Sequence, residues 1–269
     1  MIRILMALAA AAAWGGELFA SDPVPRGARS GALGGLSAPL PQEVWSAAVN
    51  PALACTVPGI CAAAEYVPAP FGLPELARAG AAVNIRAGES ALRASFTVMG
   101  SALYRELTLE AGAAVSVTAR GSLGVTCRMV SIRIRDYGQA SSTAVDVGAG
   151  FFPAEGIHVG AAVTNLAASR WPGGNLERAV QCGVWLELAD NLSAGIECWK
   201  TRRFPVEIHA GIEYLPVTGF ALRGGISQDP PGISIGAGAA AGPFAFDYAA
   251  VFHPVLGTTH VLGLCFTGD

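Results

Sequence analysis

Charged residues are scarce in this sequence, and those present nearly cancel. Asp, Glu, Lys and Arg make up 14% of the 269 residues, whereas a typical soluble domain has about a quarter. The formal net charge of −3 is too small to indicate a nucleic-acid partner. With 52% hydrophobic residues and a mean hydropathy of +0.45, either the surface faces a lipid bilayer or the chain encloses a very large core.

Apolar runs long enough to cross a membrane as helices are missing after residue 20. Before that point, the basic residue Arg3 precedes the apolar run 4–14, and the stretch ends in the small residue Ala20. This order is typical of a secretory signal peptide, residues 1–20, with cleavage after Ala20. An N-terminal membrane anchor is the alternative, although the run is short for a spanning helix. An exported apolar chain without spanning helices indicates a closed β-barrel, because lipid requires every backbone polar group to be paired.

The patterns of metal, cofactor and catalytic chemistry are also missing. The six cysteines lack a metal-binding spacing such as C-x-x-C, and the four histidines are scattered. The sequence has no G-x-S-x-G elbow, and the glycines of residues 31–35 lack the strand and the lysine of a phosphate loop. We therefore predict no catalytic residue, no metal and no cofactor, and a chain that is not an enzyme. Cys55 and Cys61 could close a short disulfide loop in an oxidising compartment, a pairing that the sequence leaves open.

A period-two alternation of apolar and polar residues runs through most of the chain. Between Arg105 and Thr118, every odd position from Leu107 to Val117 is apolar, and the even positions are polar or small. Alternate side chains of a strand point to opposite faces, so this segment predicts a strand with one apolar face. In residues 122–135 the alternation changes parity near Met129 and Val130, which predicts a β-bulge. Similar segments begin near residues 145, 157, 180, 206, 220 and 244.

The polar parity of these segments predicts which side chains line an enclosed interior. If the apolar parity touches lipid, the opposite parity faces the lumen. Such charges could form ion pairs in a polar, watery interior, or they could select solutes along a permeation path. The predicted lumen-facing polar residues are Glu106, Glu110, Asp146, Glu187, Glu197, Glu207, His209, Glu213, Arg223 and Asp247.

Short and longer connections alternate between the predicted strands. Short turns are expected at 87–89, 119–121, 153–156, 189–191 and 216–219, and longer connections at 68–77, 136–141, 169–177, 228–232 and 253–258. Outer-membrane barrels have this rhythm of periplasmic turns and extracellular loops, and an even number of strands. We predict an all-β fold, an antiparallel transmembrane β-barrel of about fourteen strands from Ile60 to Thr267. A soluble β-sandwich would show the same alternation and is the alternative.

Aromatic residues provide a second indication of a barrel. Six of them fall on the apolar parity, at the strand ends that touch the short turns. A girdle of aromatic side chains at a membrane boundary is typical of transmembrane barrels. The six residues are Phe151, Tyr214, Phe220, Phe244, Phe246 and Phe266.

The region from Ser21 to Cys55 lacks strand alternation and holds a possible helix near residues 43–49. Its phrase Arg29-x-x-x-Leu33-Gly34-Gly35, followed by Asn50-Pro51-Ala52, resembles the opening of the PorV/PorQ-type proteins, which are related to the FadL-type long-chain fatty-acid transporters. The phrases 70–76, 146–150, 160–166, 211–214, 222–225 and 247–260 fit the family in the same order, although this chain is shorter than typical members.

The resemblance implies that residues 21–58 form a plug, or hatch, and that residues 59–269 form the barrel around it. The implied plug motif is Arg29, Leu33, Gly34, Gly35, Asn50, Pro51 and Ala52. We expect an exported protein of the bacterial outer membrane, in contact with its lipid, that passively transports a hydrophobic or amphipathic small solute. A non-enzymatic scaffold for secreted proteins, as in type IX-like secretion, and a purely structural role are the alternatives.

Overall fold

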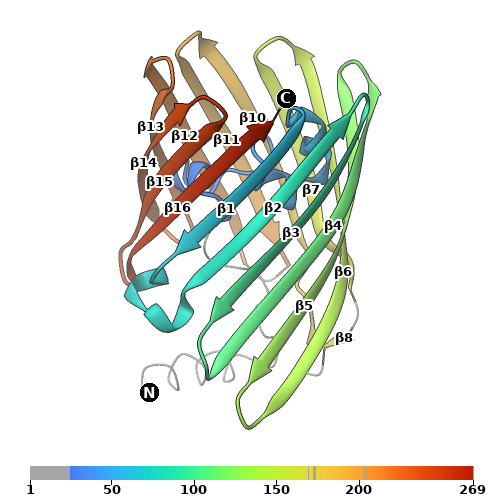
Figure 1. Cartoon of the computed structure of the whole chain (residues 1–269), viewed down its shortest axis with the longest axis vertical. Coiled ribbons are helices and arrows are strands. Elements are labelled where there is room, and N and C mark those ends of the chain that lie inside the picture. The colour runs from blue at the N-terminus through green and yellow to red at the C-terminus, as the bar shows by residue number, and fades with distance from the viewer. Residues whose placement is uncertain (1–24, 169, 172–173, 203, 269) are drawn as a thin grey trace.

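The computed structural model describes residues 25–268 apart from 169, 172, 173 and 203. The chain forms a closed barrel of fourteen strands, in which every neighbouring pair is antiparallel (Figure 1). The predicted barrel of about fourteen strands is therefore confirmed, and the β-sandwich alternative is wrong because one sheet closes on itself. The predicted signal peptide, residues 1–20, lies outside the described residues.

The strands follow one another around the barrel in sequence order. β1 closes the barrel by pairing with β16, from Ile60 opposite Gly268 to Tyr66 opposite Leu262. The two-stranded sheet of β8 (Arg170–Trp171) and β9 (Gly174–Asn175) lies in the connection between β7 and β10. The barrel strands are β1 (Ile60–Val67), β2 (Arg78–Ala87), β3 (Ser90–Gly100), β4 (Tyr104–Thr118), β5 (Gly121–Ile134), β6 (Gly138–Ala154), β7 (Ile157–Ala168), β10 (Ala179–Ala189), β11 (Leu192–Thr201), β12 (Val206–Val217), β13 (Phe220–Gln228), β14 (Gly232–Ala241), β15 (Phe244–His253) and β16 (Gly257–Gly268).

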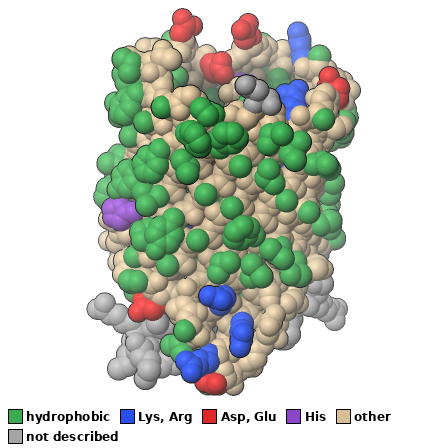
Figure 2. Space-filling view, in the orientation of Figure 1, with side chains coloured by type: hydrophobic (Ala, Val, Ile, Leu, Met, Phe, Trp, Pro, Cys, Tyr) green, Lys and Arg blue, Asp and Glu red, His purple; other side chains and the backbone are tan. Residues whose placement is uncertain are grey.

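The apolar parity of the strands points outward. Large hydrophobic side chains are exposed on β1 to β7 and β10 to β16, and they form a belt between two charged rims (Figure 2). On β4, for example, Leu109, Val115 and Val117 are exposed, whereas Thr108 and Glu110 on the other parity are buried. The six aromatic residues expected in a girdle are all exposed. The barrel is thus apolar outside and polar inside, the reverse of a soluble sandwich.

The two ends of the barrel differ in their connections. Short turns join β2 to β3, β4 to β5, β6 to β7, β10 to β11, β12 to β13 and β14 to β15, at the end where the C-terminus lies (Figure 1). At the other end, the longer connections expected at 136–141, 228–232 and 253–258 are reduced to 135–137, 229–231 and 254–256. Residues at the edges of the expected loops extend the strands instead. The connection from β1 to β2 keeps its length and contains η2 (Pro70–Gly72) and η3 (Pro74–Leu76).

Residues 25–58, here called the N-terminal segment, lie inside the barrel. The segment contains α2 (Ala28–Ala32), α3 (Ser46–Val49) and η1 (Pro51–Thr56), so the helix expected near residues 43–49 is shorter than predicted. Its apolar side chains, including Leu33, Leu36 and Leu53, are fully buried against the inner wall. No helix among the described residues is long and apolar enough to span a membrane.

The bulge expected near Met129 and Val130 is wrong. β5 keeps one register with β4 and β6 through residues 123–134. The side chains continue to alternate: Met129 is exposed, whereas Val130 and Ile132 are buried inside the barrel. Near the end of this strand the inward-facing residues become apolar and the outward-facing residues become polar, while the backbone register stays the same.

The disulfide that was left open between Cys55 and Cys61 is absent, since both thiols are free. Cys55 donates to the backbone oxygen of Glu89, and Cys61 donates to that of Pro58. Cys127, Cys182 and Cys198 are exposed on the outer face of the barrel, where they serve as small apolar residues.

Candidate functional site

Glycines in the wall seat the N-terminal segment in the half of the barrel that ends in the short turns. A Cβ added to Gly225 on β13 would clash with the backbone at residues 33–34, and one added to Gly160 on β7 would clash with Ala38. Gly34 and Gly35 follow α2 with φ of +77° and +89°, a backbone conformation that strains any side chain. Close backbone contact therefore fixes the position of the segment across the lumen.

Polar side chains of β11, β12 and β14 satisfy the segment's backbone. Glu197 accepts hydrogen bonds from the backbone nitrogens of Ser37 and Ala38, at 2.6 and 3.0 Å. The Oγ of Ser234 accepts from the nitrogen of Gly34 and donates to the oxygen of Ala32. Unpaired backbone groups would be costly at such buried positions, so these contacts stabilise the seated segment.

Arg29 connects α2 to a chain of charges on the C-terminal strands. Its Nη2 and Nε lie 2.8 and 3.0 Å from the two carboxylate oxygens of Glu213, a bidentate pair. Arg223 bridges Glu213 and Asp247, each at 2.5 Å. The guanidinium of Arg29 also lies 5.8 Å from the ring centroid of Trp185, which accounts for the aromatic residue on the polar parity of β10.

The remaining residues of the expected plug motif are buried in the same half. Leu33 packs with Leu36, Leu40 and Trp185. Asn50 caps η1 by accepting from Ala52, and its amide donates to the oxygens of Ala38 and Ala149. Pro51 and Ala52 belong to η1 and contact β5 at Gly124.

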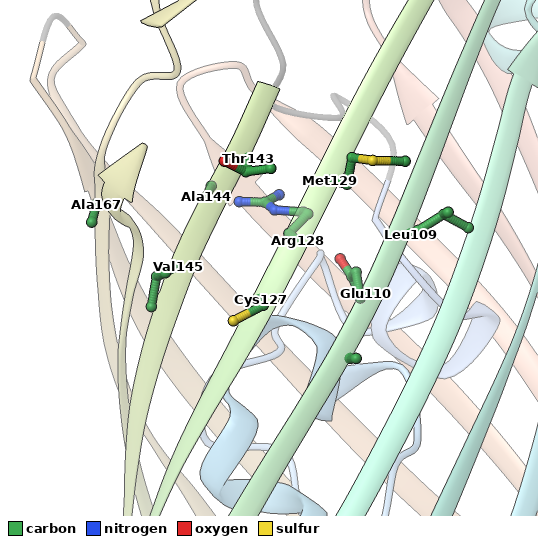
Figure 3. Close-up of a pocket in the computed structure, with 10 residues that line it drawn as sticks. Leu109, Glu110, Cys127, Arg128, Met129, Thr143, Ala144, Val145 and Ala167 are labelled. Atoms are coloured by element: carbon green, nitrogen blue, oxygen red, sulfur yellow. The ribbon is translucent and has the colours of Figure 1, made fainter. Parts of the chain in front are cut away.

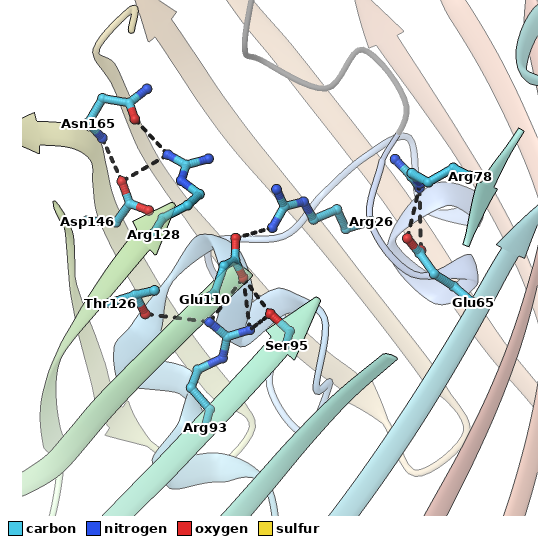
Figure 4. Close-up of polar contacts among 10 residues, drawn as sticks. All are labelled: Arg26, Glu65, Arg78, Arg93, Ser95, Glu110, Thr126, Arg128, Asp146 and Asn165. Carbon is cyan, nitrogen blue, oxygen red and sulfur yellow. Dashed lines mark hydrogen bonds and ion pairs between the residues drawn. The ribbon is translucent and has the colours of Figure 1, made fainter. Parts of the chain in front are cut away.

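A second network joins the segment to the opposite wall (Figure 4). Arg26 forms an ion pair with Glu110 on β4. The same carboxylate contacts Arg93 at 3.3 Å and accepts from Ser95 at 2.7 Å. Arg93 and Glu110 are almost fully buried, and each would carry a large desolvation cost without its partner.

Asp146 closes a break in the barrel wall between β6 and β7. The register of these strands shifts by two residues, from Val145 opposite Ala167 to Val147 opposite Val163. Asn165 occupies the bulge with φ of +55°, and its backbone nitrogen donates to Asp146 at 2.6 Å. Arg128 on β5 donates to both Asp146 and Asn165, at 3.1 and 2.7 Å (Figure 4). The Asp146 carboxylate thus replaces the backbone oxygen that would accept this hydrogen bond in a regular strand pair. We call Asp146, Asn165 and Arg128 the seam.

A cavity of about 610 Å³ lies in the wall beside the seam (Figure 3). Most of its side chains belong to the outer face, and several are small, which leaves the wall hollow between larger neighbours. Glu110 and Arg128, which take part in the inner networks, also border it. The lining residues are Leu109, Glu110, Ala111, Cys127, Arg128, Met129, Thr143, Ala144, Val145 and Ala167.

Part of the inner wall, on β4 to β6 near the longer connections, is apolar. Val130 and Ile132 on β5 are buried there with Ile134, Tyr104 and Ala140 packed around them. We call these five residues the apolar mouth. They lie on the inner face of the same strands that hold the wall cavity, and closer to the end of the barrel.

Three predicted lumen-facing residues lie near the ends of their strands. Glu106 is half-buried and accepts from the Tyr104 hydroxyl at 3.1 Å. Glu207 is 3.7 Å from His209, whose other ring nitrogen lies 2.6 Å from the oxygen of Gly34. Glu187 is exposed at the short-turn end and lies 3.3 Å from His158.

Sequence reasoning missed several arginines and their partners. Arg93, Arg128 and the pair Arg78–Glu65, with nitrogen and oxygen 3.1 Å apart, all lie on the inner parity. Glu65 also accepts from the backbone nitrogen of Gly27 at 2.8 Å. Their position on the polar parity was visible in the alternation, whereas their pairing depends on which strands become neighbours.

Burial raises the pKa of the Glu43 carboxyl in the N-terminal segment to about 7, although Arg29 opposes this shift. Its Oε1 accepts a 3.3 Å hydrogen bond from the backbone nitrogen of Trp45. Within the described part of the chain, no cluster of His, Cys, Asp and Glu side chains is arranged to hold a metal ion.

The barrel resembles solved structures of bacterial transporters. The toluene transporter TodX of P. putida aligns over 92% of this chain and 100% of its own, with a TM-score of 0.70 and 12% identity. The Ralstonia pickettii toluene transporter TbuX aligns over 91% and 99%, with 0.67 and 13%. A Pseudomonas aeruginosa FadL homologue aligns over 85% and 94%, with 0.61 and 12%. No protein-family model and no curated protein matches the sequence.

The chain therefore has a FadL-like fold. At 11–13% identity, the likeness to these structures is one of fold alone. The resemblance to PorV/PorQ-type proteins in particular stays a prediction.

Proposed function

We propose that this protein is an outer-membrane channel for the passive transport of a hydrophobic or amphipathic small solute. The observation that carries the proposal is the apolar mouth, a cluster of apolar side chains on the inner face of the barrel wall near the longer connections. A hydrophobic solute would be desolvated at such an inner surface, which favours its entry there. The neighbouring structures named as toluene transporters support the same class of solute.

In this proposal, residues 1–20 are a cleaved signal peptide, residues 21–58 a plug and residues 59–269 the transmembrane barrel. The plug blocks the straight path, because its described part is seated on glycines around the wall. The solute passes from the apolar mouth to the seam and leaves through the wall cavity into the membrane. The buried carboxylates and arginines hold the plug and the seam in place and bind no ion.

Uptake of toluene and of oleate by cells that lack their own FadL-type transporter tests the function. Cells that produce this protein should take up at least one of these solutes faster than cells with an empty vector. The proposal would be contradicted if both solutes entered the producing cells at the empty-vector rate while heat-modifiable gel migration showed a folded barrel in the outer membrane.

A matched pair of cysteine variants tests the route. Cys127→Trp places an indole in the wall cavity, whereas Cys182→Trp places the same group on the outer face of β10, away from it. Uptake should fall toward the vector level only in Cys127→Trp. An equal rate in the two variants would leave the transport function standing and exclude the wall cavity as the exit.

The scaffold role in protein secretion has no specific observation in its favour. Partners would dock on loops, and the connections at 101–103, 135–137, 229–231 and 254–256 have three residues each. These short connections offer little surface on which a partner protein could dock.

A further inference from the structure

Two arginines on the outer face of the barrel stand side by side without an acidic partner. Arg105 on β4 and Arg133 on β5 are directly opposite in the register, and both are exposed. Like charges in this arrangement repel each other. Among the described residues, none forms a hydrogen bond or ion pair with either side chain, and the nearby Asp136 lies 4.0 Å from Arg135 instead.

Neutral polar side chains surround the two arginines. Gln139 on β6 is opposite Arg133 and donates to Ser131 at 2.8 Å, and Ser141 contacts the same hydroxyl at 3.1 Å. We call Arg105, Arg133, Ser131, Gln139 and Ser141 the basic patch. Figure 2 shows Lys and Arg side chains gathered at the lower end of this face, over the ends of β4 and β5.

The depth of the patch places it at the edge of the apolar belt. Leu123 on β5 is exposed near the short-turn end, and Arg133 is ten residues further along the same strand (133 − 123 = 10). Ten residues rise about 34 Å, and a strand tilt of about 40° reduces this to about 26 Å along the barrel axis. The apolar band of an outer-membrane barrel is about 25 Å tall, so Arg133 lies at the level of lipid headgroups.

We infer that the basic patch binds the phosphate of an anionic lipid headgroup in the leaflet at the longer connections. Guanidinium groups present paired donors that match phosphate oxygens, and a shared anion would remove the repulsion between Arg105 and Arg133. The patch lies on β4, β5 and β6, between the wall cavity and the longer connections. The bound lipid would therefore lie at the rim of that cavity. The inference rests on the proposed membrane position and needs no transport of any solute.

Native mass spectrometry of the full-length protein in detergent tests this site. The probes are phosphatidylglycerol and phosphatidylcholine with identical acyl chains, offered together. The parent protein should retain phosphatidylglycerol preferentially, and Arg105→Gln with Arg133→Gln should reduce that preference about 25-fold, because each basic residue near an anionic headgroup contributes about fivefold. Arg105→Lys with Arg133→Lys should retain most of it.

The matched control removes two arginines from the other end of the barrel. Arg86→Gln with Arg120→Gln lowers the net charge equally, and both side chains are exposed there. The control should keep the preference. An equal loss in the two double variants, or no preference in the parent, would overturn the inference, whereas uptake of toluene or oleate tests the transport function separately.

Discussion

The two halves of the barrel share the same alternating strands but differ in what fills the lumen and in how the wall is held together. In the half that ends in the short turns, the lumen holds the N-terminal segment, which contacts the wall through glycines and buried apolar side chains. In the half with the longer connections, the inner surface includes the apolar mouth, and the register of the wall shifts at the seam. One half is sealed by packing, and the other depends on a few polar contacts.

The difference indicates where the structure is able to open. The N-terminal segment contacts the wall at many places, so the loss of one contact leaves the others. The seam is held by three side chains, Asp146, Asn165 and Arg128. A wall exposed to lipid tolerates an interrupted ladder only when side chains satisfy the free backbone groups. We therefore expect a small chemical change at the seam to have a large effect on the wall.

Removal of the seam carboxylate should have the largest effect. Asp146→Ala leaves Arg128 and the backbone nitrogen of Asn165 without their shared acceptor, and the loss of one partner of a buried pair costs about 3–5 kcal/mol. Urea unfolding of the barrel in lipid vesicles, followed by heat-modifiable gel migration, measures the change. Asp146→Asn keeps an acceptor oxygen and should cost clearly less; equal losses would show that the seam does not depend on that oxygen.

Displacement of the N-terminal segment should have an intermediate effect. Gly225→Ala places a methyl group against the backbone at residues 33–34, and such overpacking costs about 1–3 kcal/mol. Gly224→Ala is the control, because its added carbon would meet Ile212 at 3.9 Å and the backbone oxygen of Ser234 at 4.0 Å, both ordinary contacts. The same urea titration should separate the two variants, and identical midpoints would mean that the segment is not seated there.

A change in the pH dependence of stability should be the smallest effect. The Glu43 carboxyl has a pKa of about 7 in the folded chain, above its usual 4.5, so it is protonated more readily there. Its contribution therefore favours the folded chain below pH 4.5 and weakens as the pH rises to 7. Glu43→Gln should flatten this slope and raise the Tm at pH 8 relative to the parent, because the amide does not ionise.

Differential scanning calorimetry between pH 4 and pH 8 measures this slope in both proteins. The difference between parent and variant isolates Glu43, since the other titrating groups are common to both. Parallel curves would argue that the N-terminal segment does not bury this carboxyl.

The alternation identified most of the barrel from the sequence, because lipid-facing and lumen-facing residues have a strict period of two. It erred in β5, where apolar Val130 and Ile132 face inward and polar Ser131 and Arg133 face outward. A periodic pattern gives the two faces of a strand but cannot decide which one faces lipid when the chemistry of the faces is exchanged. The loops at 136–141 and 253–258 were predicted too long for a similar reason, since polar residues that extend a strand beyond the belt look like a loop.

Local alternation and turn residues were enough to predict a closed β-barrel of about fourteen strands and the parity of nearly every segment. The ion pairs of Arg26 with Glu110 and of Arg29 with Glu213, and the position of Asp146 at a two-residue shift between β6 and β7, could be found only in the folded chain. Such contacts join residues far apart in the chain. They depend on the register between neighbouring strands and on how the N-terminal segment crosses the lumen, and neither is encoded in the period of a single strand.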